Sequence, residues 1–344
     1  MWNIIGQDKA ITALEGAMRT GHLSHAYLIV GPPKAGKGTL AVRLAQALNC
    51  TGETPPCEEC KNCRRIVSGK HADVITISLL NAVSEEGSSR KEIGIDSIKR
   101  LQNDAYLPPF EGKRKVFIID GAEYLSQPAA NCLLKTLEEP PPGVTILLVA
   151  SREEQLLPTI VSRCQRIELL PVPSATLQIA LEEGYSVGTE QARLLSILSR
   201  GCPGWALAAI ADSDFLEAHY RQVSDLIALE EAGIEQRFAA AAKLTANFSQ
   251  QREKVDELLV LWLNWWHDVL LVSMGVRDFI SHINLENVLE ERARLYTMEE
   301  INKFLSRLRE TRQYLEWNVN PRLVMEVLML ELPSPRIPAK SKGG

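Results

Sequence analysis

Two stretches of the sequence carry residue types and spacings that could do chemistry. In the first, GPPKAGKGTL, the residues Gly31, Gly36 and Lys37 fit the phosphate-binding pattern G-x-x-x-x-G-K. Backbone N–H groups of such a loop bind phosphates at the start of a helix, and Lys37 would reach the outer phosphates. The pattern continues with a Ser or Thr that ligates Mg²⁺, but here Gly38 follows and Thr39 comes one residue late. The stretch predicts a nucleotide-phosphate loop with a weakened metal site.

The second stretch places four cysteines close together after the helix that the loop opens. Two C-x-x-C steps and one earlier thiol fit tetrahedral coordination of a structural Zn²⁺ ion, with no open position for catalysis. A redox pair and an iron–sulfur cluster are alternative interpretations of the same residues. We expect zinc to be held by Cys50, Cys57, Cys60 and Cys63.

An acidic residue at the end of a strand would complete the nucleotide site. The run KVFIID predicts a buried strand that begins at Val116 and ends at Asp120. A carboxylate in that place could hold Mg²⁺ or polarise water. A strand-end turn or a helix cap is the alternative role of Asp120.

These residues have to be positioned by alternating strands and helices. In the first half, short apolar runs alternate with helical patterns, which predicts an α/β domain with a mostly parallel sheet covered by helices. Near Leu170 the strand-like runs stop and helical patterns continue. The expected strands are Ala26–Val30, Val74–Ile77, Val116–Asp120, Thr145–Ala150 and Gln165–Leu169.

The expected domains follow this change of pattern. Residues 1–169 form the α/β domain with the cysteine excursion at 50–63, residues 170–213 a small helical domain, and residues 214–333 a larger all-helical domain. A helix is expected to start near Pro203, after a glycine turn. The polar stretch Val83–Glu92 is expected to be a mobile surface loop, and residues 334–344 a flexible tail.

The composition favours a cytoplasmic protein with substantial cores. Of 344 residues, 45% are hydrophobic and 24% charged, with a net charge of −5. That charge argues against a protein that coats nucleic acid, although a local basic patch stays open. Seven cysteines and no export signal indicate a reduced cytoplasm. The apolar stretch Leu258–Val276 is expected to be a buried helix rather than a membrane span, because Asn264, His267 and Asp268 lie within it.

Further motifs resemble those of a known family, the clamp-loader subunits of bacterial DNA polymerase III, which are AAA+ proteins. The resemblance implies a RecA-like AAA+ sheet with helices on both faces for residues 1–169, including the zinc module. It also implies a helical lid domain for residues 170–213 and a helical collar domain, which joins subunits, for residues 214–333. The motifs are HAYLIVGP before the loop, NCLLKTLEEPP at Asn131–Pro141, VSRC at Val161–Cys164 and NVNPRLVMEVLMLEL at Asn318–Leu332.

The resemblance also implies partners and a role in trans. Family members form a five-subunit ring of gamma/tau motor subunits, a delta subunit and a stator, which places the sliding clamp on primed DNA. Arg163 of the SRC motif corresponds to an arginine finger that enters the ATP site of the neighbouring subunit. A surface arginine that begins a strand is the alternative. We expect this chain to be in the stator branch of the DNA polymerase III holoenzyme.

Several positions depart from the ATP-hydrolysing members of that family. Gly121 stands where those members have a Glu that orients the attacking water, and we expect Glu123 to point elsewhere. Trp205 stands where relatives carry an Arg that senses the γ-phosphate, and we expect it to pack between domains. With Gly38 as well, we expect ATP and Mg²⁺ to be bound weakly and hydrolysed little or not at all.

Two other functions remain open from the sequence. In a gamma-type motor subunit, Thr39 and Glu123 would substitute for the missing groups. A stand-alone P-loop kinase would use the helical half as a lid, but it leaves the SRC and LEEPP motifs unexplained.

Overall fold

The computed structural model describes residues 2–79, 92–317 and 319–335, which belong to two compact units, residues 1–206 and 207–344. The first unit is built on a parallel sheet. Among the described residues its strands are β1 (Ala26–Val30), β2 (Val74–Ile77), β3 (Lys115–Asp120), β4 (Val144–Ala150) and β5 (Gln165–Glu168), in the order β2-β3-β4-β1-β5. The expected strands are therefore confirmed to within one residue at each end.

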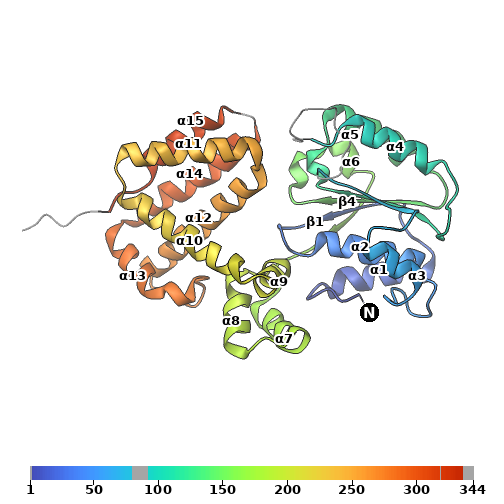
Figure 1. Cartoon of the computed structure of the whole chain (residues 1–344), viewed down its shortest axis with the longest axis horizontal. Helices are drawn as coiled ribbons and strands as arrows, with labels where there is room; N and C mark the ends of the chain where they lie inside the picture. The colour runs from blue at the N-terminus through green and yellow to red at the C-terminus, as the bar shows by residue number, and fades with distance from the viewer. Residues whose placement is uncertain (1, 80–91, 318, 336–344) are drawn as a thin grey trace, which may run out of the picture. The chain divides into compact units, whose positions relative to one another are not determined.

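Helices cover both faces of this sheet (Figure 1). In β1, Leu28 packs into a core with α4 (Ile95–Ala105), α5 (Gln127–Glu138) and α6 (Pro158–Val161). The next residue, Ile29, packs on the opposite face with α1 (Asp8–Thr20), α2 (Lys37–Asn49) and α3 (Lys61–Val67). Burial on both faces is why β1 and β4 are continuous apolar runs rather than alternating ones. The α/β part of the predicted fold class is confirmed.

A small helical segment follows the sheet. Helices α7 (Ser174–Tyr185) and α8 (Thr189–Leu198) pack together through buried residues such as Leu181 and Leu195. Helix α9 (Pro203–Ala211) begins at the predicted proline. Most of the expected loop Val83–Glu92, and residues 336–344 of the expected tail, lie outside the described residues.

In the second unit, the regular elements among the described residues are all helices. Its helices are α10 (Ser213–Glu231), α11 (Ile234–Gln250), α12 (Arg252–Ser273), α13 (Glu286–Leu295), α14 (Met298–Glu316) and α15 (Pro321–Glu331), with a short 3-10 helix η3 (Ile283–Leu285). Trp265 and Trp266 of α12 are completely buried, and the rings of Trp266 and Phe304 lie 5.1 Å apart.

Two buried charged residues of this unit, Asp268 and Arg237, have hydrogen-bond partners, which explains their presence in apolar helices. Asp268 of α12 is fully buried and accepts hydrogen bonds from the backbone N–H groups of Ser281 and His282 and from the His282 ring at 2.7 Å. Buried Arg237 donates to the carbonyl of Glu230 at 2.7 Å and to that of Leu332 at 2.6 Å, so one guanidinium satisfies the C-terminal ends of α10 and α15. None of the helices in the described ranges is long and apolar enough to cross a membrane.

Candidate functional site

The phosphate loop lies between β1 and α2 and requires both of its predicted glycines. A Cβ on Gly31 would come within 2.5 Å of the Leu169 carbonyl oxygen, so the loop can pass the end of β5 only without a side chain there. Gly36 has a φ of 98°, in the left-handed region, immediately before Lys37 opens α2. The strand–loop–helix arrangement that phosphate binding needs is therefore present.

Lys37 lies over this loop rather than in solvent. Its Nζ donates to the carbonyl oxygens of Gly31 and Pro32, both at 2.8 Å, and the residue is 7% exposed. Burial lowers the pKa of Lys37, while the carboxylates of Glu123 and Asp120 oppose that shift. An entering phosphate would have to draw the ammonium away from these two carbonyls.

Directly after Lys37, α2 lacks the hydroxyl side chain that a complete Mg²⁺ site has at that position. Gly38 has open space around its Cα, so nothing in the fold excludes a side chain there. Thr39 is exposed, and it lies about 100° around the helix from Gly38. The hydroxyl is thus displaced to another side of α2.

Asp120 ends β3 as predicted, and a left-handed turn follows it. Burial raises the pKa of the Asp120 carboxyl, against the attraction of Lys37. Gly121 has a φ of 80°, and a Cβ there would lie 2.7 Å from the ring of Tyr124. The position that lacks the water-orienting carboxylate therefore has a backbone that disfavours any side chain.

Glu123 does not point away from this edge of the sheet, contrary to the sequence-based expectation. It lies in the 3-10 helix η1 (Ala122–Tyr124), and its Oε1 accepts the backbone N–H of Ser151, just after β4, at 2.9 Å. Burial raises the pKa of Glu123, and the Ser151 N–H opposes the shift. Because 28 residues separate the two partners, this contact leaves no local signal in the sequence.

The helical segment touches the phosphate loop at Gly204. The Gly204 N–H donates to the carbonyl of Lys34 at 2.8 Å, and a Cβ on Gly204 would lie 2.8 Å from the same oxygen. The expectation that Trp205 packs between domains stays a prediction. A glycine at this contact allows the backbone of α9 to approach the loop closely.

Arg163 lies between α6 and β5, on the opposite side of β1 in the strand order from β4. Its Nη2 forms an ion pair with Glu138 Oε1 at 2.7 Å, and its Nη1 donates to the carbonyl of Thr159 at 2.9 Å. About a third of its side chain, 35%, is exposed. The candidate finger is thus accessible, and Glu138 is a partner that the sequence did not reveal.

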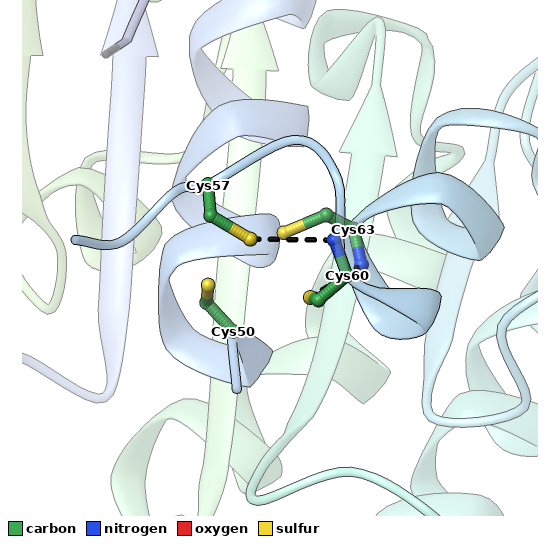
Figure 2. A group of neighbouring side chains, drawn as sticks. All are labelled: Cys50, Cys57, Cys60 and Cys63. Carbon is green, nitrogen blue, oxygen red and sulfur yellow. Dashed lines mark hydrogen bonds between the residues drawn. The ribbon is translucent and has the colours of Figure 1, made fainter. Parts of the chain in front are cut away.

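The four predicted cysteines meet in one cluster (Figure 2). Their sulfur atoms all lie within 4.8 Å of one another, and tetrahedral Zn²⁺ with Zn–S bonds of about 2.3 Å requires sulfur separations of about 3.8 Å. Cys50 follows the last residue of α2 and Cys60 caps the start of α3, so two helix ends fix the cluster. The residues fit a metal ion, and all seven cysteines of the chain are free of disulfides.

Backbone donors favour the thiolate form of two of these cysteines, Cys57 and Cys60, whereas burial raises the pKa of the Cys63 thiol. The Cys60 N–H lies 3.3 Å from Cys57 Sγ and lowers the pKa of that thiol. Burial opposes ionisation of Cys60, but N–H donors from Thr51 and Cys63 outweigh it and lower its pKa to about 5. Thiolates are the form that binds metal.

A nearby cation also faces the cluster. The Lys113 ammonium donates to the Cys50 carbonyl. Arg65, one of three basic residues near the cysteines in sequence, is instead paired with Glu111. Lys113 is 63 residues from Cys50, so sequence proximity could not identify it.

Comparisons with known proteins give one consistent result. Residues 6–173 match the family described as "DNA polymerase III, delta subunit", and residues 228–333 match "DNA polymerase III, delta subunit, C terminal". The chain is 29% identical over 330 residues to the DNA polymerase III subunit delta' of Bacillus subtilis, covering 95% of this chain and 96% of that one.

DNA polymerase III tau subunits are also similar. That of Salmonella typhimurium is 28% identical over 368 residues, covering 98% of this chain, and that of Bacillus subtilis is 26% identical over 351 residues, covering 96%. The match spans 56% and 61% of the length of those tau chains.

Proposed function

The chain belongs to the DNA polymerase III delta-subunit family, and on that premise we propose that it is the delta-prime, or stator, subunit of a clamp loader. In this role it joins gamma/tau and delta subunits in a five-subunit ring in the cytoplasm. The ring helps to place the sliding clamp on primed DNA during replication. The proposed contribution of this chain is a rigid body and an arginine, rather than ATP turnover.

What carries this proposal is the backbone at Gly121. A carboxylate that orients water cannot be added to a turn with a φ of 80° and the Tyr124 ring at 2.7 Å without moving the turn. The missing hydroxyl at Gly38 removes a second group. We propose that Gly31, Gly36 and Lys37 bind ATP weakly, with Asp120 and Thr39 near its Mg²⁺, and that turnover is negligible.

The proposed catalytic group is Arg163, acting in trans. Its guanidinium is partly exposed at the end of a short helix, where a neighbouring chain can reach it. An arginine supplied in this way stabilises charge on the transferred phosphoryl group and is worth about 10³–10⁵ in rate.

The metal at the cysteine cluster is proposed to be zinc in a structural role. Four thiolates would fill its coordination sphere, and zinc would tie the end of α2 to the start of α3. Cys50, Cys57, Cys60 and Cys63 would hold the ion, which would supply cross-linking and no reaction.

An exposed apolar face in the second unit supports the proposed collar role. Helices α11 and α15 pack against each other. On α15 the exposed apolar residues follow the three- and four-residue spacing of one helix face. A face of this kind is typical of a subunit interface. On α15 this face consists of Leu323, Val327 and Leu330, and the exposed apolar residues of α11 are Ile234 and Phe238.

One observation favours a second candidate, the gamma-type motor subunit. Glu123 lies at the nucleotide edge of the sheet and interacts with Lys37. The ATPase of the isolated chain separates the two functions. A stator shows negligible turnover, whereas a motor turns over ATP and loses that activity in Lys37→Ala.

The finger is tested in the assembled complex. With motor subunits, clamp and primed DNA, Arg163→Ala is expected to slow single-turnover hydrolysis at the neighbouring site by about 10³ while leaving assembly intact. Arg166→Ala is the matched control, because Arg166 is an exposed arginine three residues on, paired with Glu153 and Glu168. Equal rates for Arg163→Ala and wild type would exclude the proposed role.

A further inference from the structure

The Arg163 side chain is held in place by two acceptors from different elements. Glu138, at the last residue of α5, binds Nη2 at 2.7 Å, and Thr159, in α6, binds Nη1 through its carbonyl at 2.9 Å. A guanidinium has five N–H donors, and Nη1 also lies 3.5 Å from the Ser162 hydroxyl, so these contacts leave two donors for another acceptor. The guanidinium therefore has a defined orientation and unused donors at the same time.

Packing of α5 determines where Glu138 lies. Leu133 and Leu137 of the same helix are buried against the sheet, which fixes the helix from one side. Glu138 follows directly and faces outward, with 50% of its side chain exposed beside the 35% exposed side chain of Arg163. Buried residues of α5 fix the backbone next to Glu138, and the side chains of Glu138 and Arg163 are both partly exposed to solvent.

We propose that Glu138 is a positioning residue for the arginine finger, orienting the Arg163 guanidinium toward a phosphate bound by the neighbouring subunit. This inference rests on the proposed role of Arg163. An unrestrained arginine samples many rotamers, and ordering it costs entropy when the phosphate is engaged. Two acceptors that order the side chain beforehand reduce that cost and place the charge where the transition state needs it.

Glu138 could act on the Arg163 guanidinium in two ways, by positioning it for a phosphate or by sequestering it from one. A sequestered arginine would have its donors filled by its own chain and would need to break the Glu138 contact before acting. Here the charge-assisted contact uses one N–H of Nη2, so Glu138 and a phosphate can be bound together. Positioning predicts slower hydrolysis when Glu138 is removed, and sequestration predicts faster hydrolysis.

The test uses the full chain in the complex with motor subunits, clamp and primed DNA. We expect Glu138→Ala to lower kcat at the neighbouring site by about fivefold, near the upper effect of an exposed ion pair. We expect Glu138→Gln, which keeps a neutral acceptor, to lower it by about twofold. KM for ATP should be unchanged, because the contact acts through the finger in the transition state.

Two controls make the result specific. Glu139→Gln removes an exposed charge from the adjacent position and should leave kcat unchanged. In an Arg163→Ala background, Glu138→Ala should have no further effect, because a positioning residue acts only through the group that it positions.

The possible outcomes separate this inference from the proposed function. If Arg163→Ala slows hydrolysis but Glu138→Ala leaves it unchanged or faster, Glu138 does not position the finger and the finger itself stands. An additional loss from Glu138→Ala in the Arg163→Ala background also overturns the inference. If Arg163→Ala has no effect, the proposed function fails.

Discussion

Glycine occupies two positions of the nucleotide site, but the two glycines are not equivalent. Gly38 lies in the first turn of α2 with open space around it, whereas Gly121 has a φ of 80° and the Tyr124 ring 2.7 Å from any Cβ. The Tyr124 hydroxyl accepts from Arg152 at 3.2 Å, so the ring is not free to move aside. Position 38 could carry a side chain without strain, whereas the backbone at position 121 does not suit a side chain.

These glycines predict stability changes of opposite sign. Gly38→Ala is expected to raise the free energy of unfolding by roughly 0.5–1 kcal/mol, because alanine loses less entropy in a helix. Gly121→Ala is expected to lower it by about 1–2 kcal/mol, the cost of a side chain in the left-handed region. Urea denaturation of both variants checks this. A neutral or stabilising Gly121→Ala would mean that the turn relaxes easily.

Two residues of α10 predict opposite dependences of stability on pH. Burial lowers the pKa of His219 to about 4, and His282, stacked 5.4 Å away, adds to the shift. Burial also raises the pKa of Glu230 to about 7, against the Tyr296 hydroxyl and Arg292. His219 therefore stays neutral in the folded protein where the unfolded chain protonates it, and Glu230 stays neutral where the unfolded chain ionises it.

The signs follow from linkage. The stability contributed at His219 is present above about pH 6.5 and is lost as the pH falls toward 4. That contributed at Glu230 is present below about pH 4.5 and is lost as the pH rises through 7. Relative to wild type, His219→Gln should gain stability toward acid and Glu230→Gln toward neutral pH, each by at most about 1.4 kcal/mol per pH unit. Denaturation followed by tryptophan fluorescence measures both, and pH-independent differences would contradict the prediction.

At the scale of elements, the cysteine excursion joins the end of α2 to the start of α3, which are also linked by hydrogen bonds from Gln46 to the Cys63 carbonyl and from Asn62 to the Asn49 carbonyl. Cys50 ends α2 and Cys60 begins α3, while Gly52 has no room for a side chain because Cys57 Sγ would lie 2.9 Å from its Cβ. The local backbone is shaped around the sulfur atoms. The excursion should therefore depend on its metal for order, whereas the sheet has its own core.

Removal of one cysteine thiol should loosen the cysteine excursion without affecting the sheet. Cys60→Ser is expected to reduce bound zinc from about one equivalent per chain to well below it. Amide exchange should then accelerate in residues 50–63 and remain slow in β1 and β4. Cys132→Ser is the control, because a hydroxyl can replace the Cys132 thiol in its contact with Gln102 at 3.2 Å. Metal-free protein with unchanged exchange in the excursion would show that zinc is not structural.

Elements were easier to predict than the contacts between them. Strand positions follow from apolar runs that are buried on both faces, and the cysteine cluster follows from spacing, so both are visible in the sequence. Glu123 and Glu138 could not be placed in that way, because their partners Ser151 and Arg163 are 28 and 25 residues away and follow no period. A positive φ at Gly121 agrees with the conformational freedom of glycine, but the position of the Tyr124 ring against it could not be seen in the sequence.

At the scale of the whole molecule, the exposed apolar residues of α11 and α15 are expected to affect assembly with partner subunits but not folding of the chain. Val327→Glu and Leu330→Glu place a charge on an exposed surface, so the free energy of unfolding should change little. Assembly with partner subunits should weaken by roughly tenfold or more, because a buried interface would acquire an unpaired charge. Phe279→Glu, at an exposed residue outside α11 and α15, is the control. Sedimentation with partner subunits measures the effect, and unchanged assembly would place the interface elsewhere.

The turn after β3 also limits how this sequence can evolve. A glutamate at position 121 would meet a φ of 80° and the ring of Tyr124, so the substitution is expected to be destabilising. On the proposed function, a gain of ATP turnover would first require a change in the backbone of residues 121–124. On the proposed function, the chain would therefore depend on its neighbours for ATP hydrolysis even where a substitution at Gly38 is tolerated.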